Sequence, residues 1–408
     1  MPRKNPFEGL PVYLQPKLRL FLSADLVGST AFKQGPGYPL EIDTDRRITP
    51  LGPHWLEPIT SFYSDFSAEF AEQWRLFQEM AAEAPRWPTG TAPEFWKGIG
   101  DELVFVKDVR DPKEVAGSVW AWMLALQKYR TKLREKQPSL DIKSTAWIAG
   151  FPINNSEVVF DLGLPDRDIA TDDARLSHFQ KLEDFYDPKA DRTKFVRDFI
   201  GTSVDTGFRL ATKSTPRRMT ASIEVVLMIT STPPPDQKFG PIRIFFDGFE
   251  QLKGVLGGKP YPVFWIDMFQ TDSERALIDL EDRLRGRIHG AEEDLRSFCE
   301  EFIKANSKYL IRPFIFDCPD DSFKKLPPKY PEKLAEWHGK IKAERQRYAS
   351  ETKFDEPPPA SRSSKTPRSA AEIESMINDW LAGSRTGPEH LVSSHIRKSV
   401  SRQKKKRR

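Results

Sequence analysis

The spacing of hydrophobic residues divides the first 150 residues into alternating strands and helices. Apolar runs at 17–26 and 141–150 predict strands, and two short runs that flank Gly100-Asp101 predict a tight β-hairpin. Between them, apolar residues recur at helical intervals over 55–84 and 112–136. This β-α-β-β-α-β order is typical of a ferredoxin-like antiparallel sheet with helices packed on one face, so we predict an α+β fold.

Beyond residue 150 the pattern is less regular. We expect a helix from near Phe199 to about Lys213, and the β-branched run 222–229 predicts a strand. The other predictions are a polar irregular stretch at 154–194, two strands within 242–268, charged helices at 273–304 and 331–349, a proline-rich linker at 353–367 and a short helix at 370–381. We therefore expect an N-terminal arm (1–16), a main α+β domain (17–270), a charged helical extension (271–352), and a flexible linker with a basic tail (353–408).

Charge is distributed unevenly along the chain. The 63 basic and 59 acidic residues give a net charge of +4, but the last twelve residues contain eight basic residues and no acidic ones. The rest of the chain is therefore mildly acidic, which excludes a histone-like nucleic-acid binder, and no specific nucleic-acid partner is predicted. No apolar run is long enough to span a membrane, and the only cysteines are Cys299 and Cys318. We expect a cytoplasmic protein with neither a membrane anchor nor a disulfide framework.

Two aspartates follow or join predicted strands. Asp25 ends the first apolar run and is followed by Gly28-Ser29-Thr30, while Asp101 lies at the tip of the predicted hairpin. Each has a simple explanation alone, Asp25 as a helix cap and Asp101 as a turn residue. In the predicted topology, however, the two carboxylates would converge at one edge of the sheet, and neighbouring carboxylate oxygens select Mg²⁺ or Mn²⁺.

A third polar segment begins at Asp198 and runs into the predicted helix. Asp205 and Arg209 are separated by four residues and share one face of that helix. The simple explanation is a surface ion pair between them.

Together these segments resemble the three signature segments of class III nucleotide cyclases, in the same order. The family patterns are Asp-hydrophobic-x-Gly-x-Thr, Lys-x-x-Gly-Asp and Asp-x-x-Gly-x-x-Val-Asn-x-x-x-Arg. The corresponding stretches here are "DLVGST" at 25–30, "KGIGD" at 97–101 and "DFIGTSVDTGFR" at 198–209. The resemblance spans about residues 17–268 and implies a cyclase catalytic domain.

By this resemblance, Asp25 and Asp101 would hold two divalent cations, Mn²⁺ or Mg²⁺, with the carbonyl of Leu26 as a further ligand. Metal-bridged phosphates would let the ribose 3′-hydroxyl attack the α-phosphate while pyrophosphate leaves. The turn that would cradle the β- and γ-phosphates consists of Gly28, Ser29 and Thr30.

The resemblance also assigns Arg209 to stabilising the transition state, and Lys97 and Asp198 to reading the base. The family works as a dimer with sites at the interface, so a homodimer with two equivalent sites is expected. Asp205 stands where the family has an asparagine that orients the ribose. An ionised aspartate cannot donate a hydrogen bond, so Asp205 is either a catalytic residue or the ion-pair partner of Arg209.

A lysine donor and an aspartate acceptor suit the base edges of adenine, cytosine and uracil, so this pair does not separate ATP, CTP and UTP. The phrasing "SADLVGST" and "WKGIGDELVFV", with a long polar insert before "DFIGTSVDTGFRLA", resembles the pyrimidine cyclases of bacterial anti-phage defence. That resemblance favours UTP as substrate and cyclic UMP as a messenger for a separate effector. Adenylate cyclase, cytidylate cyclase and a catalytically silent nucleotide or nucleic-acid sensor stay open.

Overall fold

The computed structural model describes residues 5–35, 53–83, 86–162, 174–232, 242–268, 272–318 and 320–354. The chain divides into two compact units, Met1–Tyr348 and Ala349–Arg408. The short helix expected at 370–381 and the basic tail lie outside the described residues, as does the expected linker from residue 355 onwards. The boundaries expected for the other parts stay predictions.

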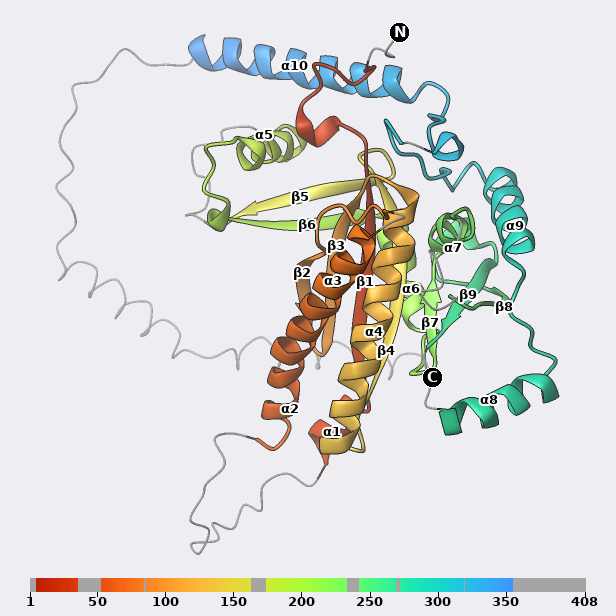
Figure 1. The fold of residues 1–408 in the computed structure, drawn as a ribbon. Helices are drawn as coiled ribbons and strands as arrows, with labels where there is room; N and C mark the ends of the chain where they lie inside the picture. Colours follow the sequence, from red (N-terminus) through yellow and green to blue (C-terminus); the bar gives the residue numbers. More distant parts are fainter. Residues whose placement is uncertain are drawn as a thin grey trace, which may run out of the picture. The chain divides into compact units, whose positions relative to one another are not determined.

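A seven-stranded sheet forms the centre of the first unit, in the order β2-β3-β1-β4-β7-β9-β8 (Figure 1). Its strands are β1 (Lys17–Val27), β2 (Glu94–Ile99), β3 (Glu102–Val109), β4 (Asp141–Phe151), β7 (Arg218–Ala221), β8 (Ile244–Glu250) and β9 (Tyr261–Asp267). The order of β2-β3-β1-β4 is that of a ferredoxin-like sheet, as predicted from the sequence. The sheet is mixed, because β4 and β7 run parallel while the other neighbours are antiparallel.

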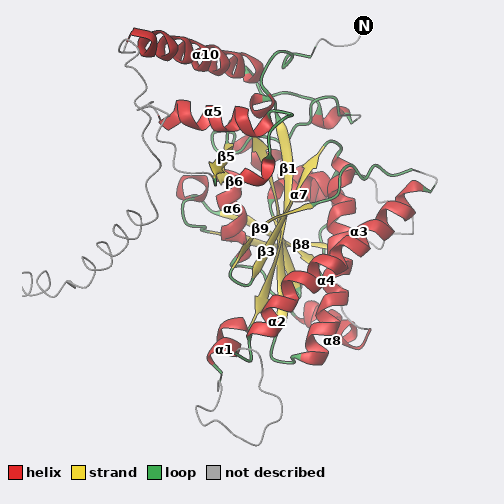
Figure 2. Cartoon of the chain, turned by 90° about the vertical axis from the view of Figure 1, so that its left-hand side faces the viewer, coloured by secondary structure: helices red, strands yellow, loops and turns green. Residues whose placement is uncertain are grey.

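Helices cover both faces of this sheet. Figure 2 shows α3 and α4 on one side of the strands and α6 on the other. The helices are α1 (Ser29–Gln34), α2 (Leu56–Ser61), α3 (Ser67–Ala82), α4 (Pro112–Lys136), α5 (Ala174–Tyr186), α6 (Thr202–Ala211), α7 (Ile223–Thr230), α8 (Asp272–Leu284), α9 (Glu292–Ala305) and α10 (Tyr330–Phe354). A two-stranded ribbon of β5 (Asn155–Asp161) and β6 (Phe195–Gly201) lies beside the sheet.

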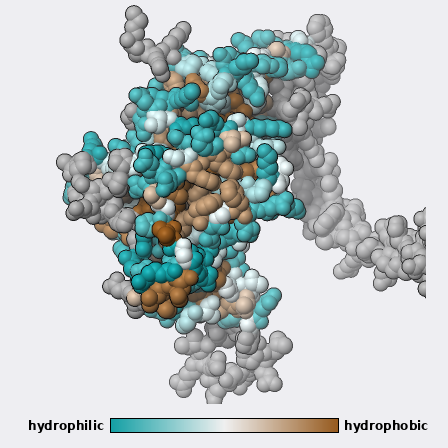
Figure 3. Space-filling view, turned by 90° about the vertical axis from the view of Figure 1, so that its right-hand side faces the viewer, coloured by the Kyte–Doolittle hydropathy of each residue, from teal (hydrophilic) through white to brown (hydrophobic). Residues whose placement is uncertain are grey.

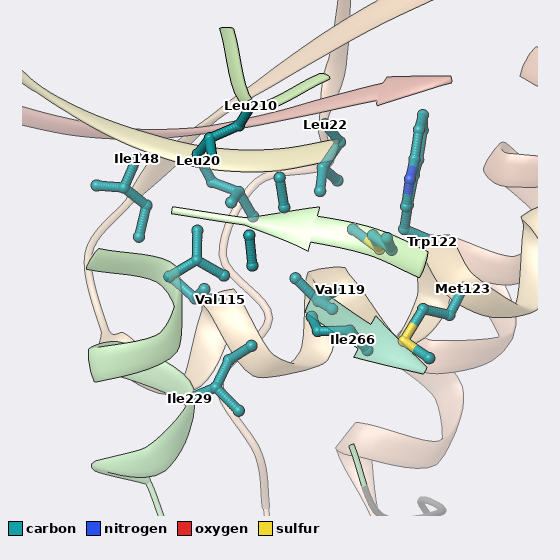
Figure 4. Packing of buried hydrophobic residues seen from close by; sticks show 14 of the residues in the cluster. Leu20, Leu22, Val115, Val119, Trp122, Met123, Ile148, Leu210, Ile229 and Ile266 are labelled. Carbon is teal, nitrogen blue, oxygen red and sulfur yellow. The ribbon is translucent and has the colours of Figure 1, made fainter. Parts of the chain in front are cut away.

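The main core lies between the sheet and the layer of α3, α4 and α7. Alternate residues of β1, such as Leu20 and Leu22, point into it and meet Val119 and Trp122 of α4 (Figure 4). Helix α4 starts as its sequence predicts, with Pro112 in the first turn and the Asp111 side chain accepting a hydrogen bond from the Lys113 amide. Because the apolar layer covers this face of β1, polar site residues of the strand lie on its opposite face.

The predicted strand at 222–229 is wrong, because this segment forms helix α7. All eight residues of α7 are buried, and six of them are apolar, with Glu224 and Thr230 the exceptions, so its sequence shows no clear helical period. A short apolar run of this kind cannot be assigned to strand or helix from periodicity. Packing of α7 between α4 and α9 decides the outcome.

Three other expectations are corrected by the structure. The stretch 154–194 was expected to be irregular but contains β5 and α5. The helix expected from near Phe199 begins at Thr202, and Asp198 and Phe199 lie in β6. The single charged helix expected at 273–304 is two helices, α8 and α9, separated by a turn in which Gly286 has a positive φ of 63°. Within the described ranges, no helix has the length and apolar content needed to cross a membrane.

Candidate functional site

The face of β1 opposite the main core carries the polar site residues. Strand alternation places Phe21 and Asp25 on this second face. The register of the sheet pairs Asp25 with Glu102 of β3 on one side and with Lys143 of β4 on the other. One acidic and one basic neighbour therefore flank Asp25 directly.

Asp25 lies in a partly buried ion pair. Its Oδ2 is 3.0 Å from Nζ of Lys143, and its side chain is 28 % exposed. Burial raises the pKa of the Asp25 carboxyl above its usual value, and the charge of Asp101 raises it further, while Lys143 opposes both effects. Asp25 and Asp101 are therefore within electrostatic reach of each other, as the sequence predicted.

Asp101 is held at the tip of the β2–β3 hairpin by the turn that follows β1. The Ser29 hydroxyl donates a hydrogen bond to the Asp101 carboxylate, and Lys33 Nζ lies 3.5 Å from Oδ1. The backbone amide of Leu26 donates to the carbonyl oxygen of Asp101 over 3.2 Å. These contacts join the first two sequence motifs into one corner of the sheet, the carboxylate corner, defined by Asp25 and Asp101.

The turn itself needs its glycine. Gly28 has a φ of 87°, and a Cβ at this position would lie 2.6 Å from the carbonyl oxygen of Ser139. Ser29 is buried, so its hydroxyl serves Asp101, whereas Thr30 is exposed at the start of α1. The first turn of α1 leaves backbone amides without intrahelical acceptors, as every helix start does.

Two further residues at this corner were not found from the sequence. The Tyr63 hydroxyl donates a hydrogen bond of 2.6 Å to the carbonyl oxygen of Gly100, which braces the hairpin tip. Oε1 of Glu102 is buried without a hydrogen-bond partner among the described residues, and burial, with the nearby charge of Asp25, raises the pKa of Glu102. The register that places Glu102 beside Asp25 could have been derived only from a correct pairing of β1 with β3.

The corner has the chemistry of a small divalent-cation site. Burial and the charge of Asp101 disfavour the ionised form of Asp25, which a cation between the two carboxylates would stabilise, and the buried oxygen of Glu102 lies nearby as a further acceptor. The described residues form no cluster of three or more His, Cys, Asp or Glu side chains set up as a complete metal site. A cation bound by Asp25 and Asp101 would therefore take its other ligands from backbone oxygen, water or a phosphate.

A β-bulge sets the position of the second motif. The register of β2 against β3 shifts between Phe95, which pairs with Phe105, and Lys97, which pairs with Val104. Phe105 belongs to the main core and Val104 to the aromatic cluster on the second face, so the extra residue turns Lys97 onto the second face. Without the bulge, Lys97 would share the face of Phe95.

On this face Lys97 meets Asp198 of β6. Nζ of Lys97 lies 2.8 Å from Oδ1 of Asp198, and both side chains are about one-third exposed. The ammonium also lies 4.1 Å from the centroid of the Trp96 ring. The two residues assigned to base reading are therefore in direct contact within one chain, although 101 positions separate them.

Helix α6 presents Asp205 and Arg209 away from the sheet. Gly207 allows the close approach of this helix, since a Cβ there would lie 2.2 Å from Cδ2 of the buried Trp147. Asp205 and Arg209 are exposed and share no hydrogen bond or ion pair with each other. The ion pair that was one of the two expectations for Asp205 and Arg209 is therefore absent among the described residues.

Asp205 and Arg209 line a cavity of about 570 Å³. Other basic side chains on its walls come from elements far apart in sequence, namely Lys17, Lys253, Lys308 and Arg312. Lys253 lies in the connection between β8 and β9, and the sequence analysis did not assign it a role. The cavity has more basic than acidic side chains, which suits a phosphate-bearing ligand.

The carboxylate corner and this cavity lie toward opposite ends of β1. Lys17 lines the cavity at the start of the strand, and Asp25 lies eight residues further on, roughly 26 Å away at the usual rise of a strand. One chain therefore does not bring Arg209 to Asp25 and Asp101. It carries two separate sets of groups.

No protein-family model matches the chain, and no curated protein sequence is similar to it. Among solved structures, it is similar to the adenylyl cyclase CyaB from P. aeruginosa, with 13% identity and a TM-score of 0.37, over 63% of this chain and 97% of that chain. It is similar to the guanylyl cyclase Cya2 with 14% identity and a TM-score of 0.35, over 63% and 96% of the two chains. The guanylate cyclase domain of RhGC from Catenaria anguillulae, in complex with GTP, is 10% identical with a TM-score of 0.35, over 63% and 100%.

Proposed function

We propose that this chain is a metal-dependent nucleotide cyclase that converts a pyrimidine nucleoside triphosphate, with UTP favoured, to its 3′,5′-cyclic nucleotide. The proposal rests on the contact of Lys97 with Asp198 on the same sheet face as the carboxylate corner. A donor and an acceptor side by side can recognise a base edge, and a carboxylate pair can hold the cations that a triphosphate brings.

In the proposed reaction, the ribose 3′-hydroxyl gives its proton to solvent water and its oxygen bonds to the α-phosphorus. The bond from that phosphorus to the oxygen of the β-phosphate breaks, and pyrophosphate leaves. Asp25 and Asp101 would hold Mn²⁺ or Mg²⁺, with the Leu26 carbonyl as a further ligand. Bound divalent cations would supply charge neutralisation on the phosphates. The backbone of Gly28, Ser29 and Thr30 would receive the β- and γ-phosphates.

Arg209 would stabilise the charge that develops around the α-phosphate. Lys253, on the wall of the same cavity, is placed to add a second positive charge. Asp205 cannot donate a hydrogen bond when ionised, so we assign it to accepting one from the ribose. Because these residues are far from Asp25 in one chain, the active form would be a homodimer with two sites at its interface.

Aromatic rings beside the base-reading pair support a pyrimidine over a purine. The Trp96 ring lies against the Lys97 ammonium, and the Phe208 ring centroid is 5.9 Å from the same atom. Large rings around the base-reading pair leave less room for a bicyclic base. We further propose that the cyclic product is a messenger in bacterial anti-phage defence that activates a separate effector protein.

Incubation of the purified full-length protein with each of the four nucleoside triphosphates and Mn²⁺, followed by chromatography of the products, tests the substrate. Cyclic UMP as the main product is the expected result, and Asp25→Asn should abolish it. Cyclic AMP as the sole product would instead identify an adenylate cyclase, and cyclic CMP a cytidylate cyclase. No cyclic product, with unchanged nucleotide binding by Asp25→Asn, would identify a silent sensor.

A further inference from the structure

Helix α8 attaches to the rest of the domain through a polar contact. Asp282 is only 7 % exposed, and its Oδ1 lies 3.0 Å from Nη1 of Arg217. Arg217 also reaches Asp267 at the end of β9, over 3.0 Å. The Arg287 guanidinium adds a weaker contact to Asp282 at 3.9 Å. The buried side of α8 is thus centred on a charged residue.

The outer side of the same helix is apolar. Leu277, Leu280 and Leu284 are 70 %, 51 % and 89 % exposed, and Ile288, just beyond the helix, is 81 % exposed. Their spacing of three or four residues places the leucines along one stripe, opposite Asp282. Figure 3 shows hydrophobic side chains at the surface in the lower part of the face that bears α8 and α9.

This arrangement inverts the usual amphipathic helix, which buries its leucines and exposes its acids. An exposed stripe of large apolar residues marks a contact surface. The neighbouring edge strand β8 is poorly suited to receive another strand, because its register is interrupted between Phe246 and Phe249 and Gly248 has a φ of 85°. The surface defined by Leu277, Leu280, Leu284 and Ile288, the α8 stripe, is one row of apolar side chains along a helix, a shape that a second helix can pack against.

We propose that the α8 stripe binds the same stripe of a second copy of this chain, with the two helices antiparallel about a two-fold axis. Such an interface must be complementary to itself, and the α8 stripe meets this requirement in shape, because one row of leucines covers the other. The α8 stripe is also complementary to itself in charge. Asp279 is exposed beside the middle of the stripe, and Arg283 is exposed one turn further along, while Glu281 and Arg285 already pair with each other within the helix over 2.9 Å.

An antiparallel pair places Asp279 of each helix beside Arg283 of the other, whereas a parallel pair would set residues of the same number, and so of like charge, at the same height. In this register Leu277 of one copy lies opposite Leu284 of the other. The α8 stripe is fixed to β7 and β9, on the far side of β4 from the carboxylate corner. The interface is therefore separate from the proposed catalytic homodimer and does not depend on the proposed function.

Sedimentation velocity of the full-length protein over a range of concentrations tests the interface. In the double variant Leu280→Glu/Leu284→Glu, the dissociation constant of one association step should rise at least tenfold. A tetramer would become a dimer, or a dimer a monomer if catalytic sites do not pair. Leu162→Glu is the matched control, since Leu162 is 66 % exposed outside the stripe. Unchanged association of the double variant, with an unchanged melting temperature, would overturn the proposal.

Cross-linking tests the orientation. Both native cysteines are buried, so single cysteines can be introduced at the stripe without strong background. A mixture of Leu277→Cys and Leu284→Cys chains should form a disulfide between the two kinds of chain, and each variant alone should cross-link poorly. Efficient self-linking of each variant would contradict the antiparallel pair. The charge swap Asp279→Arg should weaken association, and Asp279→Arg/Arg283→Asp should restore it.

Discussion

Nζ of Lys143 lies 3.0 Å from Oδ2 of Asp25, across the pairing of β4 with β1. The lysine supplies an internal positive charge for a carboxylate whose ionised form is disfavoured by burial and by Asp101. Lys33 likewise places a positive charge beside Asp101, with its Nζ 3.5 Å from Oδ1. Both carboxylates are thus neutralised within their own chain, while Arg209 lies on α6 beside a different cavity. The two sets of groups can therefore be inactivated independently.

Mixing two inactive variants tests the proposed interfacial site. Asp25→Asn removes one set of groups and Arg209→Ala the other, so each variant alone should lose activity by at least a hundredfold. In a mixed dimer, one of the two sites keeps both intact sets. An equal mixture that exchanges subunits should recover about a quarter of wild-type activity. The readout is cyclic nucleotide formed per minute.

Two controls accompany the mixing experiment. Variants that are combined without time for subunit exchange should stay inactive. The double variant Asp25→Asn/Arg209→Ala, mixed with either single variant, should also stay inactive. Full loss of activity after complete exchange would contradict a site shared between copies.

Gly207 provides a test of how α6 is placed. Replacing a helical glycine by alanine usually stabilises a helix by about 1 kcal/mol. At Gly207, however, the new methyl group would collide with the Trp147 ring, which is buried and stacked on Phe21. We expect Gly207→Ala to lower the free energy of unfolding by about 1–3 kcal/mol and to lower activity, because α6 carries Arg209.

Gly339 of α10 is the matched control for that substitution. A Cβ at Gly339 meets no atom within 4 Å, so Gly339→Ala should raise the free energy of unfolding by about 0.5–1 kcal/mol. Urea denaturation measures both changes. Equal effects at the two glycines would show that the contact with Trp147 is not restrictive.

Glu157 predicts a pH dependence of stability. This carboxyl joins the β5–β6 ribbon to β1, with Oε1 2.9 Å from Arg19 and 3.2 Å from Lys17. Burial raises its pKa, but the charges of Arg19 and Lys17 outweigh burial and lower it to about 2. A lowered pKa stabilises the fold above pH 4.5, and this contribution disappears as the pH falls from about 4.5 to about 2.

Glu157→Gln should therefore lower the free energy of unfolding by about 3 kcal/mol at neutral pH, with the difference shrinking through that acidic range. Glu336→Gln on the exposed face of α10 is the control: Glu336 also pairs with a lysine, Lys340, but in solvent, so the pH profile of stability should change far less in it. A difference between Glu157→Gln and wild type that is constant with pH would rule out the charge network as its origin.

Local signals in the sequence predicted much of the fold. The helical spacing of Val115, Val119 and Trp122 predicted helix α4 over its true bounds, and Gly100-Asp101 marked the β2–β3 hairpin. Local signals failed where burial is complete on all sides, as in α7. They failed again in the polar stretch that contains β5 and α5, where tertiary packing rather than pattern decides the structure.

The candidate site likewise contains residues that the sequence could predict and residues that it could not. The motif residues Asp25, Asp101, Lys97 and Asp198 could be selected from their order along the chain. The structure brings Lys97 and Asp198 into contact, and Asp25 and Asp101 within electrostatic reach of each other. The residues that surround them could not be selected. The positions of Lys143 and Glu102 depend on strand register, and that of Tyr63 depends on how a helix packs over the hairpin. The separation of Arg209 from Asp25 likewise follows from tertiary structure alone.

The bulge in β2 lets two successive residues, Trp96 and Lys97, lie on the second face of the sheet, while Phe95 packs on the opposite face. A deletion of Trp96 would leave Lys97 directly after Phe95, so Lys97 would still pair with Val104 and face Asp198. It would, however, remove the ring that lies against the Lys97 ammonium. The extra residue therefore decides what surrounds the lysine rather than which side of the sheet it faces.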